Sequence, residues 1–592
     1  MWVEDYKNIK RQGFNFSPRF HCEYDDIKKE LTIDENNDYI SNFFGENINV
    51  TAIIGENGSG KSSILELLFN KYDDVTLKKG LFFIYFDKDA EEDKKLIFLG
   101  VNETKINNSK YKIEMQSKMK TLQSTKTVYF SNILNENDLF LPTFIIDTHH
   151  THSVNISTTY RLSQMKLIET SSIRNSVTSF DKIYRSYRIQ QILNALILIK
   201  NKAIYIPFNL PTSITLRNID FRDYLATIEN KFENRHYRKI LKILNNNNTD
   251  EGLFKNYLSV NLIISLMLEN INSPFKEELL IKIFESKLNT NDLNNFYENV
   301  KTYVCENEWY IDREYMRSVN IRKFFDLADV LRSQVNSFTL DEASNKFETK
   351  LIINDTNFSF LETYEKLIQQ SEYFWDISFN SGLSSGEENY LYQFSRFYQL
   401  SKGFKNNPYV NLKIGSQEVK NIIFLIDEGE DTLHPRWQKN YIKYLTKFFK
   451  DNFEQNIHII VTSHSSFIVS DFPKDNILFM KDGKENIGVH KQTFGANIHT
   501  LLSDSFFMED GLIGEFAKDK IQEVIDFLNE KESPIKDANS AKKIIDIIGE
   551  PFLRNQLRKM YNQKFSNKVE IDKRINELKK ELKRLEDVKL NK

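Results

Sequence analysis

The chain has 592 residues, of which 40% are hydrophobic and 28% are charged, so it can bury sizeable cores under a soluble surface. Its 80 Lys and Arg residues nearly balance 83 Asp and Glu residues, and the net charge of −3 excludes a wholly basic protein that coats nucleic acid. Two cysteines, Cys22 and Cys305, exclude a disulfide framework and fit a reducing compartment. The first residues form no apolar signal segment, and the densest apolar stretches fall short of the roughly 20 residues that span a bilayer. We therefore expect a cytoplasmic protein with no membrane contact.

The first 150 residues have the pattern of an α/β unit. Residues 1–50 mix aromatic and apolar positions with turn-forming residues, which predicts short strands in hairpins. The β-branched run Ile48–Ile54 predicts a buried strand that enters a glycine-rich loop, and a helix is expected from Lys61 to Tyr72. Further strands are expected at residues 81–86, 96–99, 127–130 and 142–147.

Helical patterns dominate between residues 151 and 375, and they predict a large, mainly helical insertion. The clearest lie at Ile189–Lys200, Tyr237–Leu244 and Glu277–Phe284. No heptad pattern continues there for three or four repeats, so a long coiled-coil arm is not expected.

Alternation of strands and helices returns over residues 376–510, with the clearest buried strands at Ile422–Ile426 and Ile457–Thr462. Residues 511–592 are expected to be helical. Their last part, 553–592, carries 13 Lys and Arg against 6 Asp and Glu, and a heptad seam about two repeats long runs through Ile571, Ile575, Leu578, Leu582 and Leu585. This seam indicates either a terminal helix packed on its own domain or one that pairs with another chain or follows phosphates.

The strongest motif is a glycine-rich loop with the spacing G-x4-G-K-[ST] between the predicted strand and helix. Glycines let successive backbone N–H groups converge on phosphate oxygens, and the helix N-terminus adds partial positive charge. Lys61 would reach the β- and γ-phosphates, and the Ser62 hydroxyl would bind Mg²⁺. The predicted nucleotide-binding residues are Gly55, Glu56, Asn57, Gly58, Ser59, Gly60, Lys61, Ser62 and Ser63.

Two acidic residues, Asp427 and Glu428, follow the apolar strand Ile422–Ile426. Ligands of open α/β sheets bind at the carboxyl ends of strands, so this position suits catalysis. Asp427 would bind Mg²⁺, and Glu428 would orient or deprotonate the attacking water. An apolar strand that ends in two acidic residues is common, so the pair indicates a catalytic site only in combination with the upstream glycine-rich loop.

Two weaker signals complete the set. One is the turn Leu383, Ser384, Ser385, Gly386 and Glu387, and the other is His464, which follows another apolar strand. An imidazole at that position can hydrogen-bond a γ-phosphate. The order of the four signals along the chain resembles that of ABC-type ATPases.

Within that superfamily the chain resembles the branch of SMC, Rad50 and OLD-like proteins, since Asp427–Pro435 follows the pattern D-E-P-E-x-x-L-H-P with Gly429 in place of the first proline. The resemblance implies an ABC-type P-loop head with a mixed sheet and flanking helices, formed by an N-terminal lobe (1–150) and a C-terminal lobe (376–510). It implies ATP and Mg²⁺ as ligands and hydrolysis of ATP to ADP and phosphate. The turn at 383–387 would act in trans on ATP bound by a second copy, in a homodimer of heads, with Leu433 and His434 near the interface. We expect little consequence from Gly429.

One motif of the superfamily is missing, because no Q-loop glutamine follows the strand near residue 130. Ser131 and Asn132 stand at about the right place and are the expected substitutes.

The region after His464, including Phe494–Leu502 and Asp546–Pro551, resembles the PtuA ATPases of Septu-type and retron-associated anti-phage systems. That resemblance implies an HNH nuclease partner of the PtuB kind. In the retron setting it also implies a reverse transcriptase with its DNA–RNA hybrid. The alternatives are a DNA-repair ATPase of the Rad50 type, an OLD-like ATPase with its own nuclease, and a scaffold with a relic nucleotide site.

Other candidate sites are weaker. The cluster Asp147, His149, His150 and His152 is interpreted as a polar loop rather than a zinc site, and the cysteines as core thiols. We find no HNH-like spacing and no compact acidic nuclease motif after His464, so nuclease chemistry would have to come from a partner.

Overall fold

The computed structural model describes residues 1–69, 83–87, 95–99, 105–107, 112–116, 125–133, 153–163, 180–218, 258–259, 261–263, 293–306, 321–334, 348–368, 375–380, 382–401, 413–414, 417–486, 492–499, 501 and 513–590. Contacts divide the chain into two compact units, Met1–Phe506 and Phe507–Lys592. The finer boundaries near residues 150, 375 and 510 stay predictions.

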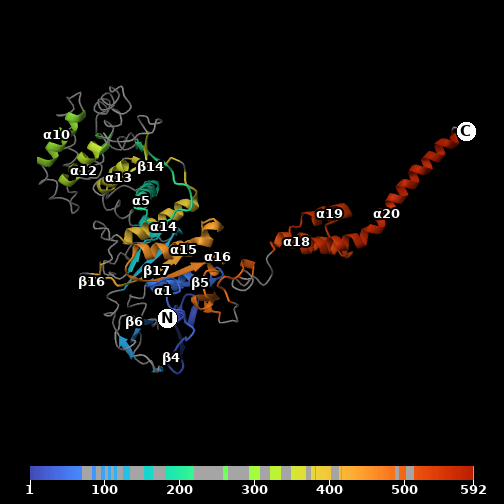
Figure 1. Cartoon of the computed structure of the whole chain (residues 1–592), viewed down its shortest axis with the longest axis horizontal. Helices are drawn as coiled ribbons and strands as arrows, with labels where there is room; N and C mark the ends of the chain where they lie inside the picture. The colour runs from blue at the N-terminus through green and yellow to red at the C-terminus, as the bar shows by residue number, and fades with distance from the viewer. Residues whose placement is uncertain are drawn as a thin grey trace. The chain divides into compact units, whose positions relative to one another are not determined.

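A seven-stranded sheet forms the centre of the first unit (Figure 1). All neighbouring strands are parallel except the last pair, which gives an α/β fold with a mixed, mostly parallel sheet. The strand order is β11 (Ser153–Asn155), β10 (Thr125–Ser131), β17 (Asn421–Asp427), β18 (Asn456–Ser463), β5 (Ile48–Gly55), β19 (Ile477–Lys481) and β20 (Lys484–Glu485).

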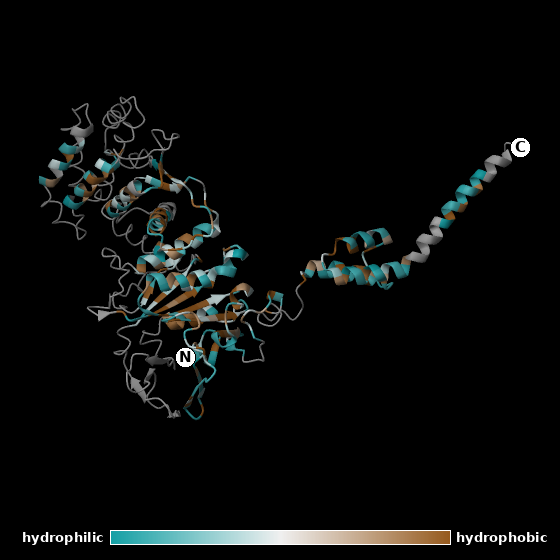
Figure 2. Cartoon of the chain, viewed as in Figure 1, coloured by the Kyte–Doolittle hydropathy of each residue, from teal (hydrophilic) through white to brown (hydrophobic). Residues whose placement is uncertain are grey.

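The central strands are hydrophobic along most of their length (Figure 2). Their side chains are mostly buried because helices cover both faces of the sheet. On one face Leu425 and Ile460 pack against α1 (Lys61–Phe69) and the N-terminal hairpin. Phe424, the neighbour of Leu425, points to the opposite face and contacts Phe397 and Phe449. These two rings belong to α14 (Ser385–Ser401) and α15 (Pro435–Asn452), so the sheet lies between α1 and this helix pair.

The predicted strands at 48–54, 422–426 and 457–462 are confirmed. Their register aligns the carboxyl ends, since Asp427 pairs with Thr462, and Thr462 pairs with Ile53. The segments that follow these strands therefore meet at one edge of the sheet.

The N-terminal hairpins are also confirmed. β1 (Trp2–Tyr6) pairs with β2 (Ile9–Gly13), and β3 (Phe20–Asp25) pairs with β4 (Glu30–Glu35), both antiparallel. β8 (Lys105–Asn107) extends the second hairpin, and a separate sheet has the order β6 (Phe83–Asp87), β7 (Lys95–Leu99) and β9 (Lys112–Gln116). The strand expected at 142–147 lies outside the described residues.

The insertion contains helices and also part of an antiparallel sheet, which the sequence patterns did not predict and whose last strand extends past residue 375. Its helices are α5 (Phe180–Lys200), α10 (Leu293–Glu306), α12 (Ile321–Gln334) and α13 (Asp355–Ile368). The sheet has the order β13 (Glu348–Ile352), β12 (Ser213–Asn218) and β14 (Trp375–Phe379), whose strands are too far apart in sequence to show a hairpin pattern. The helices expected at 237–244 and 277–284 lie outside the described residues.

Short elements elsewhere in this unit are β15 (Lys413–Ile414), β16 (Gln417–Glu418), α16 (Ser466–Val469) and η3 (Lys474–Asn476).

The second unit consists of α18 (Glu515–Leu528), α19 (Ala538–Ile547) and α20 (Pro551–Leu590). Its core joins the three helices through residues such as Val524, Ile545 and Leu557. Farther along α20, all side chains from Arg574 to Arg584 are exposed. None of the described helices has the length and apolar character needed to cross a membrane.

Candidate functional site

The loop between β5 and α1 has a backbone that favours glycine at three positions. Gly58 and Gly60 have φ angles of 78° and 103°. A Cβ on Gly55 would lie 2.3 Å from the carbonyl oxygen of Met480. Asn8 Nδ2 also donates to the Gly58 carbonyl at 2.8 Å, so the N-terminal hairpin braces the loop.

Lys61 begins α1 and is buried beneath this loop. Its Nζ donates to the carbonyl oxygens of Gly55 and Glu56, both at 3.1 Å. Burial lowers the pKa of Lys61, while the carboxylates of Glu428 and Asp427 act in the opposite direction. The ammonium is thus held by weak neutral acceptors that a phosphate could replace.

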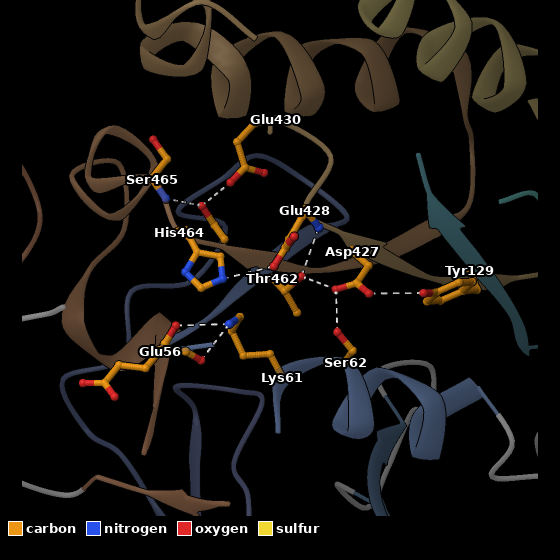
Figure 3. Close-up of polar contacts among 12 residues, drawn as sticks. Glu56, Lys61, Ser62, Tyr129, Asp427, Glu428, Glu430, Thr462, His464 and Ser465 are labelled. Atoms are coloured by element: carbon orange, nitrogen blue, oxygen red, sulfur yellow. Dashed lines mark hydrogen bonds and ion pairs between the residues drawn. The ribbon is translucent and has the colours of Figure 1, made fainter. Parts of the chain in front are cut away.

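Asp427, at the end of β17, collects three hydroxyl groups from three other elements (Figure 3). Its Oδ1 accepts from Thr462 at 2.5 Å and from Ser62 at 3.3 Å, and its Oδ2 accepts from Tyr129 at 3.2 Å. Burial raises the pKa of Asp427, and these hydrogen bonds oppose the rise.

The donor set of Asp427 and Ser62 fits Mg²⁺, a hard cation that prefers oxygen ligands and is often held by one or two protein groups plus substrate phosphates. No cluster of three or more His, Cys, Asp or Glu side chains suited to a metal occurs among the described residues. A cation on Asp427 and Ser62 would need further oxygen ligands, from water or from phosphate.

Glu428 follows Asp427 with a φ of 48°, an uncommon conformation for a residue with a side chain. Its backbone N–H donates to Thr462 Oγ1 at 3.0 Å, which fixes the turn. Its Oε1 lies 3.1 Å from His464 Nε2, and this contact lowers the pKa of Glu428. Glu428 is therefore a carboxylate at neutral pH, suitable for orienting or deprotonating a water molecule.

The segment that carries His464 is fixed by Glu430, a residue that sequence reasoning did not select. The buried Glu430 accepts a hydrogen bond from Ser463, and the Ser463 hydroxyl accepts one from the Ser465 N–H at 2.9 Å (Figure 3). Burial raises the pKa of Glu430 to about 7.

Tyr129 is a second residue that the sequence did not reveal. Neither expected Q-loop substitute makes a side-chain hydrogen bond to Asp427 in the described part of the chain: Ser131 Oγ accepts from the backbone N–H of Ile133 at 3.2 Å, and Asn132 Nδ2 has no partner there. Tyr129 reaches Asp427 instead, because it lies two residues before Ser131 in a strand whose Ser131 pairs with Asp427. A glutamine pattern could not have revealed this contact.

The predicted signature turn lies at the start of α14. The Ser384 backbone N–H donates to Glu387 Oε2 at 2.7 Å, and the Glu387 N–H donates to Ser384 Oγ at 3.4 Å, which forms a capping box. Ser384 Oγ also donates to Glu387 Oε2, at 2.8 Å. Gly386 packs so closely that a Cβ would lie 2.8 Å from the Thr432 carbonyl. Ser384 and Ser385 are exposed, and within the described ranges no hydrogen bond or ion pair joins residues 383–387 to the phosphate loop of the same chain.

Residues 429–434 connect β17 to α15. A Cβ on Gly429 would lie 2.5 Å from Tyr441 OH and 2.7 Å from Gln393 Nε2, so this departure from the superfamily pattern has the steric consequence that we did not expect. Leu433 is buried, and His434 caps α15 by accepting from the Arg436 N–H at 3.2 Å.

The remaining candidates are the histidine cluster and the two cysteines. The histidine cluster at 147–152 lies outside the described residues. Cys22 and Cys305 are half-buried rather than members of the core, and neither forms a disulfide within the described part of the chain. Burial raises the pKa of Cys22.

Together, the mostly parallel α/β sheet, the glycine-rich loop and the buried Lys61 beside Asp427 define a protein compatible with the P-loop ATPase class. No protein-family model matches the chain. Over 63 residues it is 43% identical to the retron Ec83 probable ATPase of Escherichia coli, a match that covers 11% of each protein. The matching segment is thus a small part of both chains.

Proposed function

We propose that this chain is an ABC-type ATPase that binds Mg²⁺-ATP between two copies of its head and hydrolyses it slowly. We further propose that it acts as the sensor and regulator of a partner HNH nuclease in anti-phage defence of the retron or Septu type. The observation that supports the ATPase most is the continuous network from Ser62 through Asp427 and Thr462 to Glu428 and His464. The short likeness to a retron probable ATPase supports the defence setting.

The residues divide the chemistry as follows. Backbone N–H groups of residues 55–62 and the Lys61 ammonium bind the β- and γ-phosphates. Ser62 and Asp427 hold Mg²⁺, which supplies charge neutralisation at the phosphates when bound. Glu428 positions the attacking water and accepts its proton, and His464 donates a hydrogen bond to the γ-phosphate.

The second copy completes the pocket in this proposal. Ser384 and Gly386 begin a helix whose N-terminus attracts anions, and Ser384 is exposed. They would contact the γ-phosphate bound by the partner head.

Two substitutions test the nucleotide site. Lys61→Ala should abolish ATP binding, whereas Glu428→Gln should retain ATP unhydrolysed and increase the nucleotide-dependent dimer, both measured by equilibrium binding and sedimentation. Lys420→Ala and Glu454→Gln, at exposed positions, serve as matched controls. If both site variants behave like the unaltered protein, the chain is a scaffold and not an ATPase.

The partner is tested by co-purification. A small HNH nuclease should be retained by the full chain and lost from a chain that ends near residue 552. Nuclease activity of the purified ATPase alone would contradict the proposal and favour an OLD-like enzyme. Hydrolysis stimulated by duplex DNA ends would favour a Rad50-type repair ATPase.

A further inference from the structure

The exposed part of α20 carries an apolar row that no described residue covers. The exposed fractions of Ile575, Leu578 and Leu582 are 41%, 51% and 61%. Their spacing of three and four residues places them on one face of the helix. Ile571 and Leu585 continue the same sequence register on either side. Such a row is typical of a helix that pairs with another helix.

The charges beside the row indicate the orientation of the partner helix. With Ile575 and Leu582 at heptad position a and Leu578 at position d, Arg574 and Glu581 occupy position g, and Lys579 occupies position e. In a parallel, in-register pair of identical helices, g faces e of the other helix, which brings Arg574 against Lys579. In an antiparallel pair g faces g, which brings Arg574 against Glu581 on both sides.

The antiparallel arrangement also has one preferred register. With Ile575 opposite Leu578 of the partner subunit, both Arg574–Glu581 contacts form. A shift of one heptad places Glu581 opposite itself and loses them. Arg574 also lies 3.4 Å from Glu577 of its own helix, an exposed contact that costs little to rearrange.

We propose that residues 571–582 of α20 pair with the same residues of a second copy of this chain in an antiparallel coiled coil. The interface is isologous and independent of nucleotide. The seam is about two heptads long, which is shorter than a coiled coil that is stable alone, so it acts between full chains and adds to other contacts between copies.

The experiment measures self-association of the full chain by sedimentation equilibrium, without nucleotide and in a Lys61→Ala background, so that loss of the nucleotide site cannot alter the result. Leu578→Asp should weaken association by more than about tenfold, because it places a charge in the seam. Unchanged association in Leu578→Asp would overturn the proposal. Circular dichroism shows whether α20 remains helical in each variant.

Charge reversal tests the orientation. Arg574→Glu should weaken association by about fivefold, because two attractive contacts become repulsive. Adding Glu581→Arg should restore it. Lys580→Glu makes the same change of charge on the outer face of the helix and should leave association unchanged.

Two other outcomes contradict the proposal. Stronger association in Arg574→Glu would show a parallel pair, because the new glutamate would face Lys579. If Arg574→Glu and Lys580→Glu instead weaken the binding of a duplex oligonucleotide equally, while neither alters association, the segment contacts phosphates rather than a second copy.

Discussion

Asp427 is a buried carboxylate whose two oxygens are satisfied by hydrogen bonds from the protein itself. Hydroxyl groups from Ser62, Tyr129 and Thr462 share its two oxygens, and a hydrogen bond to a charged group contributes about 1.5–3 kcal/mol. These bonds offset much of the desolvation that raises the pKa of Asp427. The same contacts tie α1, β10 and β18 to the end of β17, so the site and the sheet stabilise each other.

Glu430 should give the protein a distinct pH dependence. Its folded-state pKa of about 7 exceeds the ordinary value of 4.5, so the folded state binds more protons between these two values. The free energy of unfolding therefore falls as the pH rises from about 4.5 to about 7, by at most about 3 kcal/mol from this group. Glu430→Gln should flatten that part of the profile, as measured by denaturant unfolding. Glu454→Gln, at an exposed site, should not.

Gly429 should tolerate no side chain. Gly429→Ala places a Cβ 2.5 Å from Tyr441 OH, and we expect it to lower the free energy of unfolding by about 1–3 kcal/mol because the packed groups must shift. Gly382→Ala is the matched control, since nothing lies within 4 Å of its added Cβ. Equal melting temperatures of the two variants would show that the turn adapts.

For single residues, the sequence revealed the members of the motifs but not the residues that hydrogen-bond to them and hold them in place. Lys61, Ser62, Asp427, Glu428 and His464 stand in motifs, and the parallel strand order brings them to one edge of the sheet. Tyr129 belongs to no such motif, and Glu430, although it is the second glutamate of the D-E-P-E pattern, was given no role there. Their contacts depend on strand register and on burial, neither of which a local pattern specifies.

Among the elements, α14 shows one serine with two roles. Ser384 caps the helix through its contacts with Glu387, and in the proposed dimer it also binds the partner's γ-phosphate. Loss of its hydroxyl would remove both contributions, so a single substitution cannot separate them.

A pair of substitutions at Ser384 should separate these roles. Ser384→Ala should lower the free energy of unfolding by about 1 kcal/mol and also weaken ATP-dependent dimerisation. Ser384→Asp keeps an oxygen that accepts from the Glu387 N–H, but it loses the hydrogen bond donated to the Glu387 carboxylate and sets two carboxylates side by side, so it should lower the free energy of unfolding about as much as Ser384→Ala. It should weaken dimerisation more than Ser384→Ala does, because a carboxylate repels the γ-phosphate. Thermal unfolding and sedimentation with ATP check the two effects. If Ser384→Asp dimerises normally, the turn does not act in trans.

The helices and strands that could be predicted are those that a local sequence pattern indicates. The strands at 48–54, 422–426 and 457–462 are continuous apolar runs, and α5 has a long helical pattern. The sheet of β12, β13 and β14 was missed because β12 is paired with strands more than a hundred residues later in the chain, where no hairpin turn signals the pairing.

On the scale of the whole molecule, two units with separate cores should unfold in separate steps. A ligand that binds only the first unit stabilises only that unit, by RT ln(1 + [ligand]/Kd). Calorimetry should therefore show two transitions, and ATP with Mg²⁺ should raise the temperature of one. Lys61→Ala should remove the shift without altering the other transition. A single transition that moves as a whole would show that the units unfold together.

The length of α20 has a final consequence for how many neighbours one chain can hold. The exposed apolar residues of α20 begin well beyond the residues that pack on α18 and α19. A copy that binds them therefore need not be the copy that shares the ATP site in the proposed dimer of heads. A chain with two self-complementary surfaces either uses both within one pair, around a common twofold axis, or links successive pairs. Which of the two arrangements forms decides how many other copies one chain binds. In the second arrangement, a higher protein concentration alone would convert separate pairs into a growing array.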